Sequence, residues 1–480
     1  MSTKTTASPK ADNVLTDIAK YVINYRITSV EAYRAARLCL IDSLGCALHA
    51  SLHPACTKLL GPVVPGITVA NGAKVPGTSF QLDPVAAAFN LSAMIRWLDF
   101  SDTASGGREN GHPSDNIGAI LATADYLSRV RIAGGKKPLL MRDVLTAMVK
   151  AYEIQGGIGH RNSFHSHGYD NAILVKVASA AVVAAMLGGT NDEIVSAVSN
   201  SFVDGQTLRN YRQEGSMGSR KSWAGADAAS RGVYLALLAL RGEMGYPIAL
   251  SAKKWGAYDT FFKGAPFEFQ RKYGSTIIEN VNFKISYPTA FNCQPAVECA
   301  LKLYPEVSPR LAEVEKIVIT THSRGITISD KRGPLRNPAD RDHCFQYIVA
   351  IALLKGSLSV TDYEDEVAAD PRIDVLRAKT VCVENKQWTR DNTDPKKRAV
   401  PCAVQVFFKD GSKTRNITIE YPLGHQARRK DGIPLLEAKF EANLARRFAP
   451  KRQAAILSLC RSQQRLEATP VHEFVDLLAV

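Results

Sequence analysis

Two apolar segments separated by a polar connection determine how the N-terminal part of this chain can fold. Residues 86–98 are apolar at helical spacing, and Asp83-Pro84 before them is typical of a helix start. A second run with the same spacing begins at Ile117. The connection Ala104-Ser-Gly-Gly-Arg-Glu-Asn-Gly contains three glycines and no large apolar residue, so it is predicted to be a loop.

Ionisable side chains flank this connection at the facing ends of the two predicted helices. Asp99, Asp102 and Thr103 follow the first helix, and His112 precedes the second. The free N–H groups at a helix start attract anions, so the junction suits an anionic substrate. An ordinary loop, with Asp102 and Ser114 as helix caps, is the alternative that local chemistry leaves open.

Periodicity along the chain predicts three parts. Helical spacing predicts helices at 15–25, 30–48, 141–154, 172–187, 192–203 and 222–240, and a β-like excursion at 67–79. Strand-like runs follow at 314–322, 325–329, 399–408 and 413–421, with a helix at 344–355, and then two more helices at 435–448 and 453–466. The predicted fold is mainly α: a large all-helical domain (1–275), a smaller α/β lid domain (276–422), and a C-terminal segment (423–480) that returns to the helical domain.

Composition argues against several classes of protein. The 480 residues are 45% hydrophobic, as in a globular protein, and no apolar run reaches the ~18 residues of a membrane-spanning helix. Nine scattered cysteines without a C-x-x-C pair argue against a disulfide framework and against a zinc or iron–sulfur site. The sequence therefore predicts no metal, no cofactor and no membrane partner.

The excess of positive charge has two explanations. A formal net charge of +14 would suit nucleic acid, but the densest clusters, Asp394-Pro-Lys-Lys-Arg and Ala427-Arg-Arg-Lys, lack interleaved aromatic residues. We therefore expect a small polyanionic substrate and no nucleic-acid partner, with an RNA-binding helical scaffold as the alternative. The polar segment 1–13 has no apolar signal core, which predicts a cytoplasmic protein, or a mitochondrial-matrix protein if a transit peptide was removed.

Cations that could hold such a substrate occur in three motifs. Thr207-Leu-Arg-Asn-Tyr-Arg and Gly218-Ser-Arg-Lys-Ser-Trp supply Arg209, Arg212, Arg220 and Lys221, the last two beside a predicted helix start. Lys284 lies in Asn282-Phe-Lys-Ile-Ser-Tyr-Pro, at the predicted domain border. Exposed surface charges are the alternative explanation for all of them.

Two further motifs contribute candidate polar residues. Asp340-Arg-Asp-His-Cys-Phe-Gln-Tyr supplies Arg341, His343 and Tyr347, and the last two would share a helical face at i,i+4. Asp170 ends a histidine-containing segment and is expected to border the site, whereas His165 in the same segment is expected to be an ordinary loop residue.

Three motifs resemble the 2-methylcitrate dehydratase branch of the MmgE/PrpD family, which includes fungal-type 2-alkylcitrate dehydratases. They are Trp97-Leu-Asp-Phe-Ser-Asp-Thr, His112-Pro-Ser-Asp-Asn-Ile-Gly-Ala-Ile-Leu and Asn337-Pro-Ala-Asp-Arg-Asp-His, and the resemblance extends from about residue 15 to the C-terminus. It implies a homodimer with its active site between the two domains. It also implies metal-independent dehydration of a small tricarboxylate, 2-methylcitrate or a longer 2-alkylcitrate, to the corresponding cis-aconitate.

The resemblance also implies residue roles. The active site of the aconitate-decarboxylating relatives matches Asp99, Thr103, His112, Lys221, Lys284 and Tyr347 in this sequence. His112 would transfer the proton, Asp99 would orient it or act as partner base, and Tyr347 would assist the leaving hydroxyl. Lys221, Lys284 and Arg220 would bind carboxylates.

Two departures from the family pattern affect the predicted substrate. The loop 104–110 lacks the tryptophan usual in the dehydratases, which leaves room for a longer alkyl chain, as in a secondary-metabolite pathway. The decarboxylase branch has a second histidine in a region that here reads Ile285-Ser-Tyr-Pro-Thr-Ala-Phe-Asn. Its absence favours a dehydratase over the alternative, a cis-aconitate decarboxylase.

Overall fold

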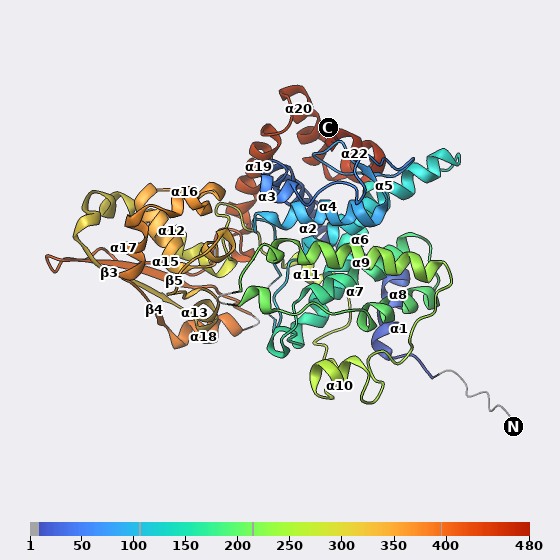
Figure 1. The fold of residues 1–480 in the computed structure, drawn as a ribbon, viewed down its shortest axis with the longest axis horizontal. Helices are drawn as coiled ribbons and strands as arrows, with labels where there is room; N and C mark the ends of the chain where they lie inside the picture. The colour runs from blue at the N-terminus through green and yellow to red at the C-terminus, as the bar shows by residue number, and fades with distance from the viewer. Residues whose placement is uncertain (1–8, 105–106, 214–215, 395) are drawn as a thin grey trace.

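Two separate hydrophobic cores organise the chain, as the computed structural model shows for residues 9–104, 107–213, 216–394 and 396–480 (Figure 1). The larger core takes its residues from Leu15–Ile285 and again from Leu436–Leu478. The smaller core lies within Ala290–Ile419. The small domain is thus inserted between two parts of the large one.

The large domain is a bundle of helices built around an almost fully buried central one. Its main helices are α1 (Asn13–Asn24), α2 (Val30–Ala50), α4 (Pro84–Trp97), α5 (Ile117–Ala133), α6 (Met141–Arg161), α7 (Ala172–Met186), α8 (Asn191–Val203) and α9 (Arg220–Leu240). The central helix, α7, consists almost entirely of Ala, Val and Leu-type residues and packs against α6, α8 and α9. Small apolar side chains on every face allow neighbouring helices to approach from all sides.

Helix starts in this domain follow the local chemistry of the sequence. The Asp83 carboxylate accepts hydrogen bonds from the backbone N–H groups of Val85 and Ala86, and Pro84 occupies the first turn of α4. The β-like excursion predicted at 67–79 is mostly irregular, with only the short strands β1 (Ala73–Lys74) and β2 (Gln81–Leu82) paired there. No described helix is both long and apolar enough to cross a membrane.

The small domain is a four-stranded sheet covered by helices. The strand order is β4 (Thr380–Glu384), β3 (Val314–Thr321), β5 (Cys402–Phe408) and β6 (Ile417–Ile419). β3 is parallel to β4 and antiparallel to β5, with Ile319 opposite Cys382 and Val404. α12 (Gln294–Val307) packs on β5 and β6, and α15 (Phe345–Lys355) packs on α12 (Figure 1).

Two secondary-structure predictions are wrong in this half of the chain. The run 325–329 was expected to be a strand, but it belongs to the helix α13 (Ser323–Ser329), whose first turn is capped by the His322 side chain. The run 453–466 is two helices, α20 (Pro450–Cys460) and α21 (Gln463–Ala468), because Ser462 caps a new helix start. In both places a capping side chain overrides the apolar spacing.

The C-terminal helices return to the large domain beside its N-terminal helices (Figure 1). α19 (Arg429–Ala445) packs on α2, and α22 (Val471–Leu478) packs on α5 and α6. Lys439 of α19 donates hydrogen bonds to the Asp42 carboxylate (2.8 Å), the Phe100 carbonyl (2.6 Å) and the Lys284 carbonyl (2.8 Å). The last helices therefore support the two segments that carry candidate site residues.

Candidate active site

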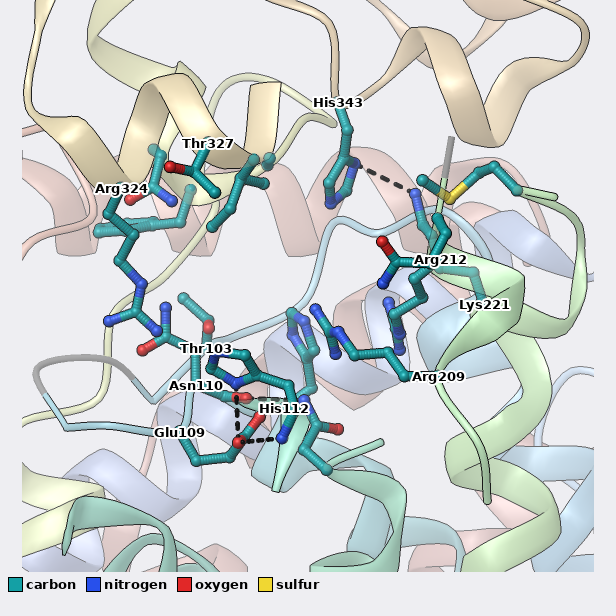
Figure 2. A pocket seen from close by; sticks show the side chains of 18 of the residues that line it. Thr103, Glu109, Asn110, His112, Arg209, Arg212, Lys221, Arg324, Thr327 and His343 are labelled. Atoms are coloured by element: carbon teal, nitrogen blue, oxygen red, sulfur yellow. Dashed lines mark hydrogen bonds and ion pairs between the residues drawn. The ribbon is translucent and has the colours of Figure 1, made fainter. Parts of the chain in front are cut away.

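A cavity of about 420 Å³ opens between the two domains, within the size range of ordinary small-molecule sites (Figure 2). Side chains of the large domain line one side, and His343, Arg324 and Thr327 of the small domain face them. The predicted residues in the cavity wall are Thr103, His112, Arg209, Arg212, Lys221, Lys284 and His343. His112, Lys221 and Lys284 therefore share one cavity, as the catalytic prediction requires.

Short backbone pairings place the loop residues in this wall. Thr103 exchanges two backbone hydrogen bonds with Asn282, at 2.8 and 2.9 Å. Ala104 pairs in the same way with Gly111. The end of α4, the start of α5 and the segment carrying Lys284 are thereby held side by side. Ser105 and Gly106 of the predicted loop lie outside the described residues.

His112 is held in a tautomer that suits a base. Its Nδ1 lies 2.8 Å from the Asp102 carbonyl, which can only accept, so Nδ1 carries the proton. Within the described chain no hydrogen bond engages Nε2, which remains an acceptor. Burial, and then the charges of Arg96 and Lys284, hold the pKa of His112 well below its usual value. The imidazole is therefore neutral at neutral pH.

The predicted orienting role of Asp99 is replaced by the Asp102 carbonyl. Asp99 instead anchors a buried group of cations: it pairs with Arg96, and its Oδ1 lies 2.7 Å from Lys284 Nζ. Burial would raise the pKa of Asp99, but the charges of Arg96 and Lys284 hold it well below its usual value. Asp99 has φ of 48°, a left-handed conformation that is uncommon for non-glycine residues but that aspartate tolerates better than most.

A second carboxylate holds the neighbouring cation. Lys221, in the first turn of α9, donates to both oxygens of Asp342 at 2.7 and 2.6 Å. Asp342 also accepts from Nδ1 of His343 at 2.5 Å. Burial and the charge of Lys221 lower the pKa of His343 to about 4. The small domain thus contributes a neutral imidazole, and the large domain an ammonium group paired across the domain boundary.

These carboxylates also define the one group of described residues spaced for a metal ion. Ligand atoms of Asp99, Asp342 and His343 lie within 4.8 Å of one another. Lys284 and Lys221 already sit 2.7 and 2.6 Å from the two carboxylates. Because two ammonium groups neutralise this acidic pair, the donor set does not fit a resident divalent cation.

Two arginines on the large-domain side share one buried counter-ion. Arg212 and Arg209 donate to the same Asp170 oxygen at 2.6 and 3.3 Å. Asp170 itself is fully buried and does not line the cavity. Burial would raise its pKa, but the charges of Arg212 and Arg209 lower it. Asp170 therefore positions the arginines and does not contact a ligand.

Basic side chains outnumber acidic ones in the wall itself, while the carboxylates that pair with four of them lie behind it. Its charged basic residues are Arg209, Arg212, Lys221, Lys284 and Arg324, against the single carboxylate of Glu109 among the described lining residues. Glu109 is itself engaged, because it accepts from His165 Nδ1 at 2.8 Å and from the backbone N–H of Phe164 at 2.8 Å. Such a wall suits a ligand with several carboxylates.

Sequence reasoning missed Arg324, Glu109 and His165 as cavity residues. Arg324 was hidden because its segment resembled a strand, although His322-Ser323 is a helix-capping pair that could have indicated a helix. Glu109 and His165 were seen only as loop residues. Their contact depends on the loop folding against the end of α6, which no local pattern reveals.

Besides Asp99 and Asp170, which lie behind the wall, three more predicted site residues lie outside the cavity. Arg220 stacks on the Trp223 ring at 4.3 Å and pairs with Asp227. Arg341 donates to the Tyr363 carbonyl at 2.6 Å inside the small domain. Tyr347 is buried in the small-domain core, because α15 begins at Phe345 and the expected shared face with His343 does not form.

We expect the substitution Tyr347→Phe to leave kcat within about threefold of the unaltered enzyme. The hydroxyl donates to the Asp362 carbonyl at 2.6 Å and does not reach the cavity wall. Its loss should cost about 1–3 kcal/mol of stability, since the carbonyl is left without that donor. Steady-state kinetics and urea unfolding measure the two effects. A kcat reduced a hundredfold in a folded variant would restore Tyr347 to the catalytic group.

The sequence of this chain is similar to those of known proteins over its whole length. The family model of the MmgE/PrpD N-terminal domain matches residues 16–270, and that of the C-terminal domain matches residues 287–464. A 2-methylcitrate dehydratase of Cupriavidus necator is 58% identical over 100% of both chains, and one of Escherichia coli (strain K12) is 56% identical over 98% of both. A mitochondrial 2-methylcitrate dehydratase of Yarrowia lipolytica is 48% identical over 98% of this chain and 91% of its own. The chain therefore belongs to the MmgE/PrpD family.

Proposed function

We propose that this chain is a hydro-lyase that converts 2-methylcitrate to 2-methyl-cis-aconitate. The observation that carries the proposal is the combination, in one cavity, of a neutral imidazole with a free Nε2 and five basic side chains. A tricarboxylate needs several cations, and removal of water needs a base next to one of its carboxylates. The names of the relatives at 56–58% identity describe this activity for those proteins.

His112 acts as the base in this proposal. Its Nε2 removes the proton from the carbon next to a substrate carboxylate, and the Asp102 carbonyl fixes the ring through Nδ1–H. Charge develops on that carboxylate as the proton leaves. The cations of the wall, chiefly Lys221 and Arg212, stabilise this charge.

Lys284 acts as the acid. Burial lowers its pKa to about 8, against the opposing influence of Asp99, so the ammonium is protonated at neutral pH but gives up its proton readily. Two of its three N–H groups are directed at Asp99, at 2.7 Å to Oδ1 and 2.9 Å to the carbonyl. The third is available to the departing hydroxyl, which leaves as water.

The decarboxylase alternative is less well supported by the cavity wall. The segment in which that branch carries a second histidine contributes Ala290, Phe291 and Asn292 to the wall. None of these can transfer a proton to the alkene carbon as an imidazole would. The proposal does not fix the length of the substrate's alkyl chain, because residues 105 and 106 of the loop 104–110 are outside the described residues.

A substrate panel tests the proposal. Citrate, 2-methylcitrate and longer 2-alkylcitrates are assayed with a chelator present, with alkene absorbance and carbon dioxide release measured in parallel. We expect alkene formation from 2-methylcitrate without carbon dioxide, and unchanged rates in the chelator. Release of carbon dioxide from cis-aconitate would favour the decarboxylase, and faster turnover of longer alkylcitrates would move the substrate to that class. A homodimer and a cytoplasmic location are part of the proposal, to be checked by light scattering and fractionation.

We expect kcat/KM to fall above about pH 8, by at most tenfold per pH unit. The Lys284 ammonium is present below its pKa of about 8 and is lost as the pH rises through that value, so the proton donor for the departing hydroxyl disappears. The measurement is a pH profile of kcat/KM. In Lys284→Arg, kcat/KM should be low at every pH, because a guanidinium gives up no proton, and the alkaline limb of the residual activity should disappear below pH 10, because the guanidinium stays charged. An unchanged limb in that variant would assign the titration to another group.

A further inference from the structure

A second cavity, of about 330 Å³, adjoins the catalytic one at the same domain boundary. The two share Asn110, Asn292, Ser323 and Arg324 in their walls. The remaining described lining residues of the second cavity are Gly107, Arg108, His160, Arg161, Gln270, Asn392, Thr393, Arg398 and Val400. Anything that fills the outer cavity therefore lies directly beside the inner one.

The outer cavity is lined by cations and by no carboxylate among the described residues. Arg108 and Arg161 extend from the large domain, while Arg324 and Arg398 extend from the small one. Burial, and then the charges of Arg271, Arg398 and Arg161, lower the pKa of His160 in the same wall. Basic side chains from both domains thus line this cavity, and none of its described lining residues carries a carboxylate.

The backbone around the outer cavity only partly offsets the charge of these side chains. Helix α6 ends there, and its terminal carbonyls would carry partial negative charge. The carbonyls of Gly159 and His160 are instead occupied by the backbone N–H groups of Glu109 and Arg108, both at 2.9 Å. Because these two carbonyls are already hydrogen-bonded, they offset the arginine charges less than free carbonyls would.

Arg324 stands where the two cavities meet. Its Nη1 donates to the Gly107 carbonyl at 3.2 Å, so this small-domain side chain contacts the large-domain loop. Figure 2 shows its guanidinium on the side of the inner cavity opposite Arg212 and Lys221. Arg324 lines both cavities and is the one charged residue among the four that they share, so a ligand that moves between them stays within its reach.

We propose that the outer cavity is an anion-binding antechamber that captures the polycarboxylate substrate before it moves past Arg324 into the catalytic cavity. The proposal rests on the proposed function for the identity of the substrate, but not for the existence of the outer site. Arginine suits it because its planar donors bind carboxylates in pairs. Convergent positive charge in a cleft also raises the local concentration of an anionic substrate and its rate of entry.

The kinetic test uses the double variant Arg108→Gln with Arg161→Gln. Both side chains are exposed, so the fold should be unaffected. We expect kcat/KM to fall about tenfold, its dependence on ionic strength to weaken, and kcat to stay the same. Arg446→Gln removes an exposed arginine that lines neither cavity and serves as the matched control. An unchanged kcat/KM and salt dependence in the double variant would overturn the proposal.

A binding test separates this inference from the proposed function. The ligand is tricarballylate, a tricarboxylate with no hydroxyl to lose. Calorimetry measures its binding to the variant Lys221→Met, which lacks one cation of the inner cavity. Weak binding to Lys221→Met should remain. It should disappear when Arg108→Gln and Arg161→Gln are added to that variant. Absence of this residual binding, or equally strong binding of inorganic phosphate, would overturn the polycarboxylate antechamber. Residual binding to Lys221→Met, together with no activity of the unaltered protein on any alkylcitrate, would sustain the outer site and reject the dehydratase assignment.

Discussion

Replacement of His112 by alanine should lower kcat by about 10²–10⁴-fold, the range expected when a general acid–base group is removed. The imidazole is fixed by the Asp102 carbonyl through Nδ1 and is kept neutral by burial and two neighbouring cations. His343 is the other wall imidazole whose pKa is lowered, but its Nδ1 is bound to Asp342 and its Nε2 lies 3.7 Å from a carboxylate oxygen of Asp99, so it faces a carboxylate.

The binding of the substrate should change much less than its turnover in this variant. The basic side chains that hold the carboxylates remain, so the Kd for tricarballylate should stay within about fivefold of that of the unaltered enzyme. Loss of one hydrogen-bonded charge pair with the ligand would weaken binding much more. His167→Ala is the matched control, since His167 is exposed and lies outside the cavity wall. A kcat within tenfold of the unaltered enzyme would remove His112 from the proton transfer.

The second large effect is expected in stability. Asp99→Asn should lower the free energy of unfolding by about 3–5 kcal/mol, because it leaves Arg96 and Lys284 buried without their shared counter-ion. Asparagine has nearly the shape of aspartate and tolerates the left-handed backbone at this position. The change therefore removes charge without adding strain.

Urea unfolding followed by tryptophan fluorescence measures this loss. The matched control is Asp227→Asn, which breaks the exposed pair with Arg220 and should cost no more than about 1 kcal/mol. Equal destabilisation by the two substitutions would show that the buried cations do not depend on Asp99. Supplying a tricarboxylate should restore part of the stability of Asp99→Asn, because the ligand brings negative charge to Lys284.

The helical domain could be predicted well because its signals are local. Asp83-Pro84 and Ser29 are helix starts by chemistry alone, and the structure begins α4 and α2 directly after them. The small domain was predicted less well at 325–329, where alternating isoleucines resemble a strand but His322 caps a helix. A capping interaction there outweighs a weak apolar pattern.

The cavity residues could be predicted where a motif placed them beside the helix junction, as for Thr103 and His112. Arg324 and the Glu109–His165 pair could not, since each depends on contacts between segments more than 50 residues apart. Tyr347 shows the opposite error. Its spacing from His343 suggested a shared face, but which side of a helix faces a cavity is decided by packing, and α15 directs Tyr347 into the small-domain core.

The return of the last helices to the large domain has a consequence for the order in which the protein forms on the ribosome. Residues 290–419 contain the complete core of the small domain, which can close while later residues are still being added. The large core needs Leu436–Leu478. Lys439 joins Phe100 to Lys284 only after α19 has emerged. During synthesis the small domain can therefore fold first. The N-terminal helices of the large domain can complete their core only after the C-terminal helices have been made.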